Sequence, residues 1–275
     1  MQSIGNLQDV EFNDYFRSWR RYRKLSQLEL ALAANVSQRH VSWLETGRSK
    51  PSREMVIRLS EAMEIPLRER NTFLQTAGFA NVYTEKALDE PAMSAVFDVI
   101  RTILDHHDPM PAVVVDRLWN VRMKNRGADL MFSLAGDSEA VWRSIGDDGE
   151  HNLALLTLHP QGLRPYIANW EAAAPEFIRR LKREALASGD PRMQEKFEKI
   201  IALAGPVAEV GESRSHLMPV LPLEISVNGL NLSLFSVITT FGTPQDITTE
   251  ELRIEAFYPS DKDTAAIFQN LSSDH

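Results

Sequence analysis

The stretch from Ser26 to Glu45 constrains this chain more than any other, because it has the pattern of two short helices joined by a tight turn. Ser26, followed three residues later by Glu29, forms a capping box and predicts a helix start. Asn35 tolerates the left-handed conformation that a sharp turn needs, and Ser37 is suited to cap the second helix. The pattern predicts a helix-turn-helix, whose second helix enters the DNA major groove.

Apolar residues in this stretch predict how the two helices pack. Leu28, Ala31 and Leu32 recur at helical spacing, so we expect them to form the buried face of the first helix. Val41 and Leu44 give the second helix its buried face. An ordinary two-helix corner with a solvated polar face is the alternative. Capping, turn chemistry, the small Ala31 and a basic loop after the second helix all favour the helix-turn-helix.

Polar side chains on and after the second helix are candidate DNA contacts. We expect Gln38, Arg39 and Ser42 to read bases, because Gln pairs bidentately with adenine and Arg with guanine. Only the N-terminal part of such a helix reaches base edges. Arg48 and Lys50 follow in the next loop, where we expect them to contact phosphates.

Several short motifs between residues 10 and 80 form a recognisable set: Ser26-Gln27, Leu30-Ala31, Val36-Ser37-Gln38, Val41-Ser42, Leu44-Glu45, Gly47-Arg48 and Pro51. This segment resembles the phage-repressor-like, or XRE, DNA-binding domains. The resemblance implies five helices and a phosphate contact from Gln27. It also implies that Arg20 and Glu45 form a buried ion pair between the first and third helices.

Length and composition limit the remaining choices. The chain has 275 residues, enough for two domains, and no cysteine, which excludes disulfides and thiolate chemistry. No apolar run approaches the roughly 20 residues of a membrane span, and the first residues lack a signal-peptide pattern. We therefore expect a cytoplasmic protein without a membrane partner. Residues 1–80 carry a net charge of +3 and residues 81–275 carry −11, which favours DNA binding at the N-terminal domain.

The C-terminal part mixes strand and helix patterns. Residues 111–115 and 119–123 read as strands, and helical patterns occupy 125–134, 152–158, 166–187 and 191–203. Alternating apolar residues flank Asn228-Gly229, a type I′ hairpin signal, and a final strand follows at 252–257. We predict an all-α helix-turn-helix domain at 1–80, a linker at 81–91 and an α+β domain at 92–275. That domain has a five-stranded antiparallel sheet, a helical insertion, and helices on one face.

A second set of motifs lies in this region: Trp119 with Asn125, His159-Pro160-Gln161-Gly162-Leu163-Arg164-Pro165, Asn169-Trp170, Phe241-Gly242-Thr243-Pro244-Gln245-Asp246, Leu252-Arg253-Ile254-Glu255 and Tyr258-Pro259-Ser260-Asp261. The region resembles the MmyB-like ligand-binding domain. The resemblance implies a PAS-like fold and a bacterial regulator that holds a small amphipathic, fatty-acid-like molecule. It implies no required cofactor.

We expect the ligand between the sheet and the helices of residues 152–203, because such layers can enclose a cleft. A carboxylate would need a cation or several donors at the pocket mouth. Arg122 and Asn125 are our candidates for that role, with His159 and Arg164 as alternatives; Arg122 also reads as a partly exposed strand residue. The expected apolar lining is Val113, Val115, Val121, Leu232 and Leu234.

The function that this sequence indicates is sequence-specific regulation of transcription on double-stranded DNA, with ligand sensing in the second domain. One recognition helix covers a half-site, so we expect a homodimer. The alternative is a second domain that only dimerises or binds a protein partner. No nucleophile elbow, glycine-rich phosphate loop or metal-ligand set appears, so we assign no catalytic or metal-binding residue and expect no enzyme.

Overall fold

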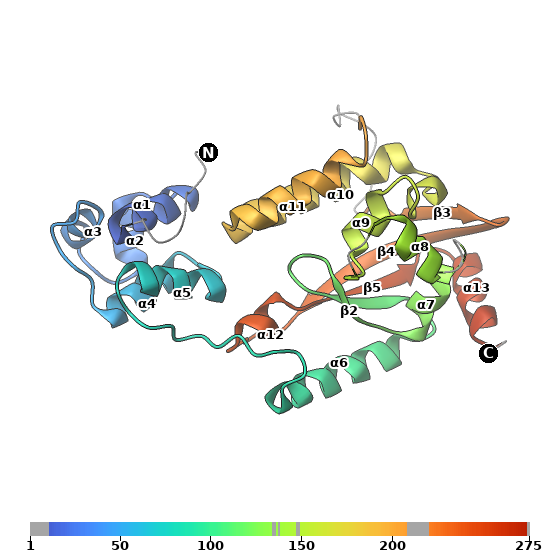
Figure 1. Ribbon diagram of the computed structural model, residues 1–275, viewed down its shortest axis with the longest axis horizontal. Coiled ribbons are helices and arrows are strands. Elements are labelled where there is room, and N and C mark those ends of the chain that lie inside the picture. The colour runs from blue at the N-terminus through green and yellow to red at the C-terminus, as the bar shows by residue number, and fades with distance from the viewer. Residues whose placement is uncertain (1–10, 134–135, 137, 147–148, 208–219, 274–275) are drawn as a thin grey trace. The chain divides into compact units, whose positions relative to one another are not determined.

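The computed structural model describes residues 11–133, 136, 138–146, 149–207 and 220–273 (Figure 1). The chain forms two compact units. The first comprises residues 1–86 together with 244–250, and the second comprises residues 87–243 together with 251–275. The predicted linker at 81–91 therefore begins inside the first unit.

The first unit contains the predicted helix-turn-helix. The capping box is present, because the Ser26 hydroxyl accepts from the Glu29 amide and the Glu29 carboxylate accepts from the Ser26 amide. Asn35 has the predicted left-handed backbone, with φ +52°. The helices are α1 (Phe12–Tyr22), α2 (Gln27–Ala33), α3 (Gln38–Glu45), α4 (Arg53–Ala62) and α5 (Leu67–Thr76).

The buried face of α2 differs from the prediction. Leu30 and Ala31 are buried, whereas Leu28 and Leu32 are 52% and 73% exposed. The helix has only seven residues, and Leu30 with Ala31 directs it onto the aromatic core of the unit. Leu28 and Leu32 have helical spacing, but they lie on the solvent-exposed face of α2. The prediction that they are buried is therefore wrong.

The second unit is built on the predicted five-stranded antiparallel sheet, in the order β2-β1-β5-β4-β3. Asn228 and Gly229 both have positive φ, as a type I′ turn requires. The strands are β1 (Ala112–Val115), β2 (Val121–Lys124), β3 (Leu223–Val227), β4 (Leu230–Thr240) and β5 (Arg253–Pro259).

Helices cover both faces of this sheet, and not one face as predicted (Figure 1). β1 is buried on both sides: Val113 and Val115 belong to the main core with α9, α10 and α11, while Val114 packs with Ile100 and Leu104 of α6. A continuous apolar strand is the pattern of a strand covered twice. The helices are α6 (Ser94–His107), α7 (Arg126–Ser133), α8 (Ser138–Ser144), α9 (Leu153–Leu158), α10 (Trp170–Ser188), α11 (Pro191–Ala202), α12 (Ile247–Glu251) and α13 (Lys262–Ser273).

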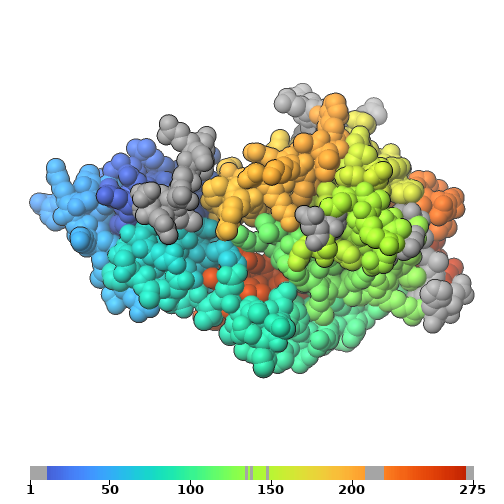
Figure 2. All heavy atoms as spheres, viewed as in Figure 1, coloured from blue at the N-terminus to red at the C-terminus, as the bar shows by residue number. Residues whose placement is uncertain are grey.

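α8 and α12 were not expected from the sequence. α10 and α11 form a layer of side chains over one side of the second unit (Figure 2). α10 runs through Pro175 without ending there. Of the stretch between α11 and β3, residues 203–207 and 220–222 are described.

The connection between β4 and β5 belongs to the first unit, although both strands belong to the second. Within the first unit, the Asp246 carboxylate accepts from the Thr84 hydroxyl at 2.9 Å and from the Lys86 amide at 3.2 Å. The Glu250 carboxylate accepts from the Leu67 amide, at the start of α5, at 2.8 Å. Residues 244–250 are therefore held to the DNA-binding unit by several hydrogen bonds.

Candidate DNA-binding surface and ligand cavity

The start of α3 presents the predicted base-reading side chains to solvent. The Ser37 hydroxyl accepts from the His40 amide at 3.1 Å and so fixes where the helix begins. Gln38 and Arg39 are exposed, and Ser42 is half-buried. The guanidinium of Arg39 lies 4.4 Å from the ring centroid of Trp43. Trp43 received no role from the sequence, and the structure makes it the platform on which Arg39 stacks.

Arg48 and Lys50 lie exposed in the loop after α3. The loop turns at Gly47, whose φ of +71° suits glycine. Two exposed cations beside the recognition helix are where phosphate contacts fall in proteins of this design. The geometry is consistent with the predicted division between base reading and phosphate binding.

Glu45, at the end of α3, is the centre of a buried polar cluster. The predicted pair is confirmed: Arg20 Nε lies 2.5 Å from Glu45 Oε1 and Arg20 Nη2 lies 3.1 Å from Oε2. Gln27 Nε2 donates to the same carboxylate at 2.7 Å, so part of its amide is used inside the domain. Burial alone would raise the pKa of Glu45, but hydrogen bonds from Arg20 and Gln27 outweigh it and lower the pKa.

The second unit contains a cavity of about 220 Å³ between the sheet and the helices α9 and α10. Its walls are mostly apolar, and β3, β4 and β5 supply the floor. Polar side chains also reach it: Thr157, Glu176, Arg180, Ser236 and Glu255. Among the apolar lining residues are Leu158, Trp170, Phe177, Ile225, Leu234 and Phe257.

Local sequence signals position the cavity walls. A Cβ atom on Gly162 would lie 2.1 Å from the Leu156 carbonyl oxygen, so only glycine fits there. This close approach lets the Leu163 amide donate to the same carbonyl at 2.8 Å, which places Leu163 in the wall. Asn169 bridges to the start of β3, donating to the Pro222 carbonyl and accepting from the Glu224 amide. Trp170 follows it into the lining.

One end of the cavity carries a network of four charged side chains around the Trp119 indole. Arg180 donates to Glu184 at 3.0 Å and to Glu255 at 3.1 Å. Arg253 pairs with Glu184 at 2.6 Å. The indole nitrogen of Trp119 donates to Glu184 at 2.8 Å, and the guanidinium of Arg180 lies 4.3 Å from the indole ring centroid. The network holds two positive and two negative charges.

Electrostatics within this network favour the ionised form of Glu184. Burial alone would raise the pKa of Glu184, but Arg253 and Arg180 outweigh it and lower the pKa.

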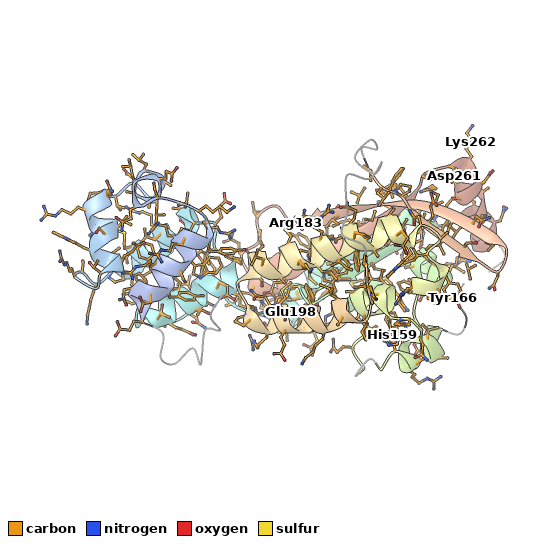
Figure 3. All side chains as sticks on the ribbon, turned by 90° about the horizontal axis from the view of Figure 1, so that it is seen from above. His159, Tyr166, Arg183, Glu198, Asp261 and Lys262 are labelled. Carbon is orange, nitrogen blue, oxygen red and sulfur yellow. The ribbon has the colours of Figure 1, made fainter. Side chains whose placement is uncertain are left out.

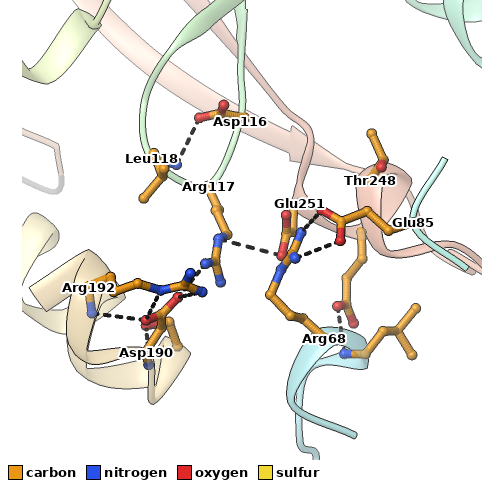
Figure 4. Close-up of polar contacts among 12 residues, drawn as sticks. Arg68, Glu85, Asp116, Arg117, Leu118, Asp190, Arg192, Thr248 and Glu251 are labelled. Carbon is orange, nitrogen blue, oxygen red and sulfur yellow. Dashed lines mark hydrogen bonds and ion pairs between the residues drawn. The ribbon is translucent and has the colours of Figure 1, made fainter. Parts of the chain in front are cut away.

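Trp119 has φ +68°, an uncommon conformation for such a large residue. A turn at Asp116 holds it, because the Asp116 carboxylate accepts from the Leu118 amide at 2.8 Å (Figure 4). The same carboxylate accepts from the Asn120 amide at 3.0 Å.

Most of the predicted ligand-binding residues lie elsewhere. Leu234 lines the cavity, whereas Val113, Val115 and Leu232 are core residues and Val121 packs beside that core. They share the correct side of the sheet, but neighbouring side chains fill the space above them.

The predicted polar anchors are not among the lining residues of this cavity, and each has protein partners. Arg122 pairs with Asp116 at 2.6 Å and with Glu150 at 3.0 Å. Asn125 bonds to backbone groups, including the amide of Ala112 at 2.8 Å. His159 follows the end of α9 (Figure 3), where its Nδ1 accepts from the Gln161 amide; burial lowers its pKa. The remaining alternative, Arg164, donates to the Leu203 carbonyl at 3.2 Å and stacks on Trp170.

Sequence reasoning missed Arg180, Glu255 and Trp119. Arg180 and Glu255 each stand among other charges: Arg253 shares the face of β5 that carries Glu255, and Glu176 and Glu184 lie one turn to either side of Arg180 on α10. Buried charges need partners, but this local pattern allows several pairings and does not single out the pair of Arg180 and Glu255.

The described part of the chain contains neither a metal-binding cluster nor a membrane-spanning helix. No group of three or more histidine, aspartate or glutamate side chains there is arranged to hold a metal ion. No helix there is long and apolar enough to cross a bilayer. The neighbouring residues His106, His107 and Asp108 do not converge: the His107 ring packs on Tyr258 and bonds to the Phe257 carbonyl.

A helix-turn-helix unit joined to an α+β unit with an internal cavity defines a DNA-binding transcription regulator with a ligand-binding domain. Comparison with protein families agrees. The helix-turn-helix family matches residues 16–70, and the MmyB-like transcription regulator ligand binding domain matches residues 96–271. The second match spans more than half of the chain, which therefore belongs to the MmyB-like family.

Other comparisons are more distant. No curated protein matches this chain. Among solved structures, the PAS domain from Bordetella pertussis BvgS is 12% identical, with a TM-score of 0.26; the match covers 65% of this chain and 96% of that one.

Proposed function

We propose that this protein regulates transcription by binding double-stranded DNA sequence-specifically, and that a small amphipathic molecule in the cavity changes its affinity for DNA. The molecule is fatty-acid-like in having a slim apolar chain and one polar end. The observation that carries this proposal is a mostly apolar cavity whose lining includes the ion pair of Arg180 and Glu255. The function requires no catalytic residue and no cofactor.

In the proposed DNA complex, Gln38, Arg39 and Ser42 contact bases. Arg48 and Lys50 contact phosphates, with a further phosphate contact from Gln27. The support is the exposure of Gln38 and Arg39 at the start of α3 and of the two cations just after it. The acidic second domain would be repelled by DNA, so it is expected to extend away from the duplex.

The proposed active form is a homodimer in the bacterial cytoplasm, on an operator with two half-sites. A stripe along α6 supports a dimer surface in the second unit. Val99 and Ile103 are 49% and 37% exposed, and His107, one turn further, packs on the exposed Tyr258. Such apolar side chains gathered on one surface are a common mark of protein contacts. Sedimentation of wild type and Ile103→Glu tests this: a monomeric wild type contradicts the dimer.

Ligand binding can change DNA affinity only if it favours one conformation over another. The chain passes between its two units after Lys86, after Thr243 and after Glu250, so the linker is not the only covalent route. We propose that the cavity acts on the DNA-binding unit through these crossings, including the linker near residues 80–91. Such couplings are typically about 1–3 kcal/mol and reciprocal.

The decisive experiment is native mass spectrometry of the purified full-length protein, followed by operator titration. A co-purifying small molecule, and an operator affinity that changes when that molecule is removed and restored, are expected. If a molecule binds but operator affinity stays constant, the ligand is structural. If nothing binds, the alternative function holds, in which the second domain serves only for dimerisation or protein contact.

A further inference from the structure

The charge balance at the polar end of the cavity limits what can bind there. Arg180 is the cationic side chain among the described lining residues, and it already contacts the carboxylates of Glu184 and Glu255. Glu176 and Glu255 add two carboxylates to the lining itself. Glu176 has its own partner, Arg179, at 2.6 Å. The lining therefore has no excess of positive charge to offer an anion.

We propose that the cavity selects a slim apolar molecule with an uncharged polar end, such as a hydroxyl, ester or amide, over the matching carboxylate. This inference rests on the proposed function, since it concerns the ligand of the same cavity. It names Arg180 and Glu255 as the residues that set this selectivity.

A ligand carboxylate would compete with Glu255 for Arg180, the one cation in the described lining, and where it displaces Glu255 it breaks the pair. Glu255 is buried, with 5% of its surface exposed, so it would be left as a buried carboxylate without its partner. Breaking a buried pair in this way is strongly unfavourable. The ligand would also bring a third negative charge close to Glu184 and Glu255, and like charges in one site disfavour ionisation.

An uncharged end avoids both costs. Carboxylate oxygens have more lone pairs than the Arg180 contacts use, so Glu255 can still accept a hydrogen bond from a ligand hydroxyl or amide. The Ser236 hydroxyl also reaches the cavity and can donate to an ester or amide carbonyl. The pair between Arg180 and Glu255 stays intact in either case.

Cavity size favours a slim ligand. The volume of about 220 Å³ is below the roughly 300–1,000 Å³ of pockets that enclose drug-sized ligands. Aromatic and branched walls, including Trp170 and Phe177, suit a single alkyl chain. Eight-carbon probes are therefore a suitable first series.

The test uses the full-length protein, stripped of bound lipid, and calorimetric titration at pH 8 with octanol, methyl octanoate, octanoate and octylamine. We expect octanol and methyl octanoate to bind at least about tenfold more tightly than octanoate. The free-energy cost of breaking one buried ion pair is larger than a tenfold difference in affinity requires. Equal or tighter binding of octanoate overturns the inference, and so does preferred binding of octylamine. If none of the four binds, the proposed ligand function fails instead.

A variant tests the mechanism. Glu255→Gln keeps the shape of the side chain but removes the charge that competes for Arg180. We expect octanoate to bind this variant about tenfold more tightly than wild type, so that the preference for octanol over octanoate falls. Glu198→Gln removes the same charge from the exposed side of α11 and is the matched control (Figure 3). Unchanged octanoate binding to Glu255→Gln contradicts the role of this pair.

Titration of wild type with octanoate at several pH values keeps the inference testable if that variant does not fold. A free carboxyl of this kind has a pKa near about 4.3, so lowering the pH from 8 to 5 raises its neutral fraction. Octanoate is then expected to bind more tightly. Octanol has no carboxyl group, so its binding serves as the control for any pH-dependent change of the protein groups around the site, which are Glu176, Glu184, Arg180, Arg253 and Glu255. Octanoate binding that is independent of pH, relative to octanol, overturns the inference.

Discussion

Removal of either partner from the buried pair of Arg20 and Glu45 should lower the stability of the DNA-binding unit. Glu45 is 3% exposed and Arg20 is 12% exposed, counting their side chains alone. In Glu45→Gln, Arg20 loses its carboxylate partner and keeps its hydrogen bond to the Leu25 carbonyl, at 2.6 Å. In Arg20→Met, the Glu45 carboxylate keeps the Gln27 amide. Each variant therefore leaves one buried charge without its counter-ion.

The expected loss is about 3–5 kcal/mol for each single variant. In a unit of this size, each kcal/mol corresponds to roughly 4–8 °C in melting temperature, so the unit should melt at least about 12 °C earlier. The double variant, Arg20→Met with Glu45→Gln, removes both charges and should lose less than the sum of the two. Native-state hydrogen exchange of the α1 and α3 amides in the full-length protein measures each loss locally.

Arg101→Met is the matched control, because Arg101 and Asp98 form an exposed pair on α6 at 3.0 Å. Exposed pairs contribute only about 0–1 kcal/mol, so this variant should leave exchange of the DNA-binding unit unchanged. Single variants of Arg20 and Glu45 that each lose under 1 kcal/mol, or losses that simply add in the double variant, would refute the reasoning.

Acid should weaken the same pair. The pKa of Glu45 is lowered in the folded state, so its contribution is fully present above the ordinary carboxylate pKa. The contribution is lost as the pH falls from that value through the lowered one. Exchange of the α3 amides should accelerate in that acidic range in wild type, and the acceleration should be smaller in Glu45→Gln.

Four other changes test the first unit. Arg39→Ala should cost about 1–3 kcal/mol on cognate DNA and relax selectivity at one base pair, whereas Lys50→Ala should weaken all sequences alike; equal losses on cognate and random DNA contradict base reading by Arg39. Trp43→Ala should lower affinity for cognate DNA by roughly 0.5–1 kcal/mol by removing the platform under Arg39, and it should have no effect when Arg39 is already alanine. Asp246→Ala should speed hydrogen exchange at the Lys86 amide, because that amide donates a hydrogen bond to the Asp246 carboxylate. Unchanged exchange would show that this contact is unimportant in solution.

Local chemistry explains what the sequence could predict. The capping box at Ser26, the left-handed Asn35 and the turn at Asn228-Gly229 depend on residues a few positions apart, and all three are confirmed. The ion pair between Arg20 and Glu45 spans 25 positions, and it was predicted from a resemblance, not from spacing. Capping and turn signals, and a known arrangement of helices, therefore gave predictions that the structure confirms.

Other features depended on partners that the sequence does not identify. Leu28 and Leu32 have helical spacing, but α2 buries Leu30 in the core and leaves these two leucines exposed. Arg122 was chosen as a cation within an apolar strand, yet Asp116, six positions earlier, neutralises it. The cation at the cavity, Arg180, finds its partner Glu255 75 positions away, and no short-range pattern specifies that pair.

The proposed effect of the cavity on the first unit would use another long-range connection, the chain between β4 and β5. Ser236 of β4 and Glu255 of β5 line the cavity, and the chain that joins these two strands includes residues 244–250 of the DNA-binding unit. Glu250 accepts from the Leu67 amide at the start of α5, and Asp246 accepts from Lys86. A ligand that shifts β4 against β5 would therefore pull on a segment that is hydrogen-bonded to that unit. Because the segment is short and held at several points, this route transmits a displacement more directly than a flexible tether could.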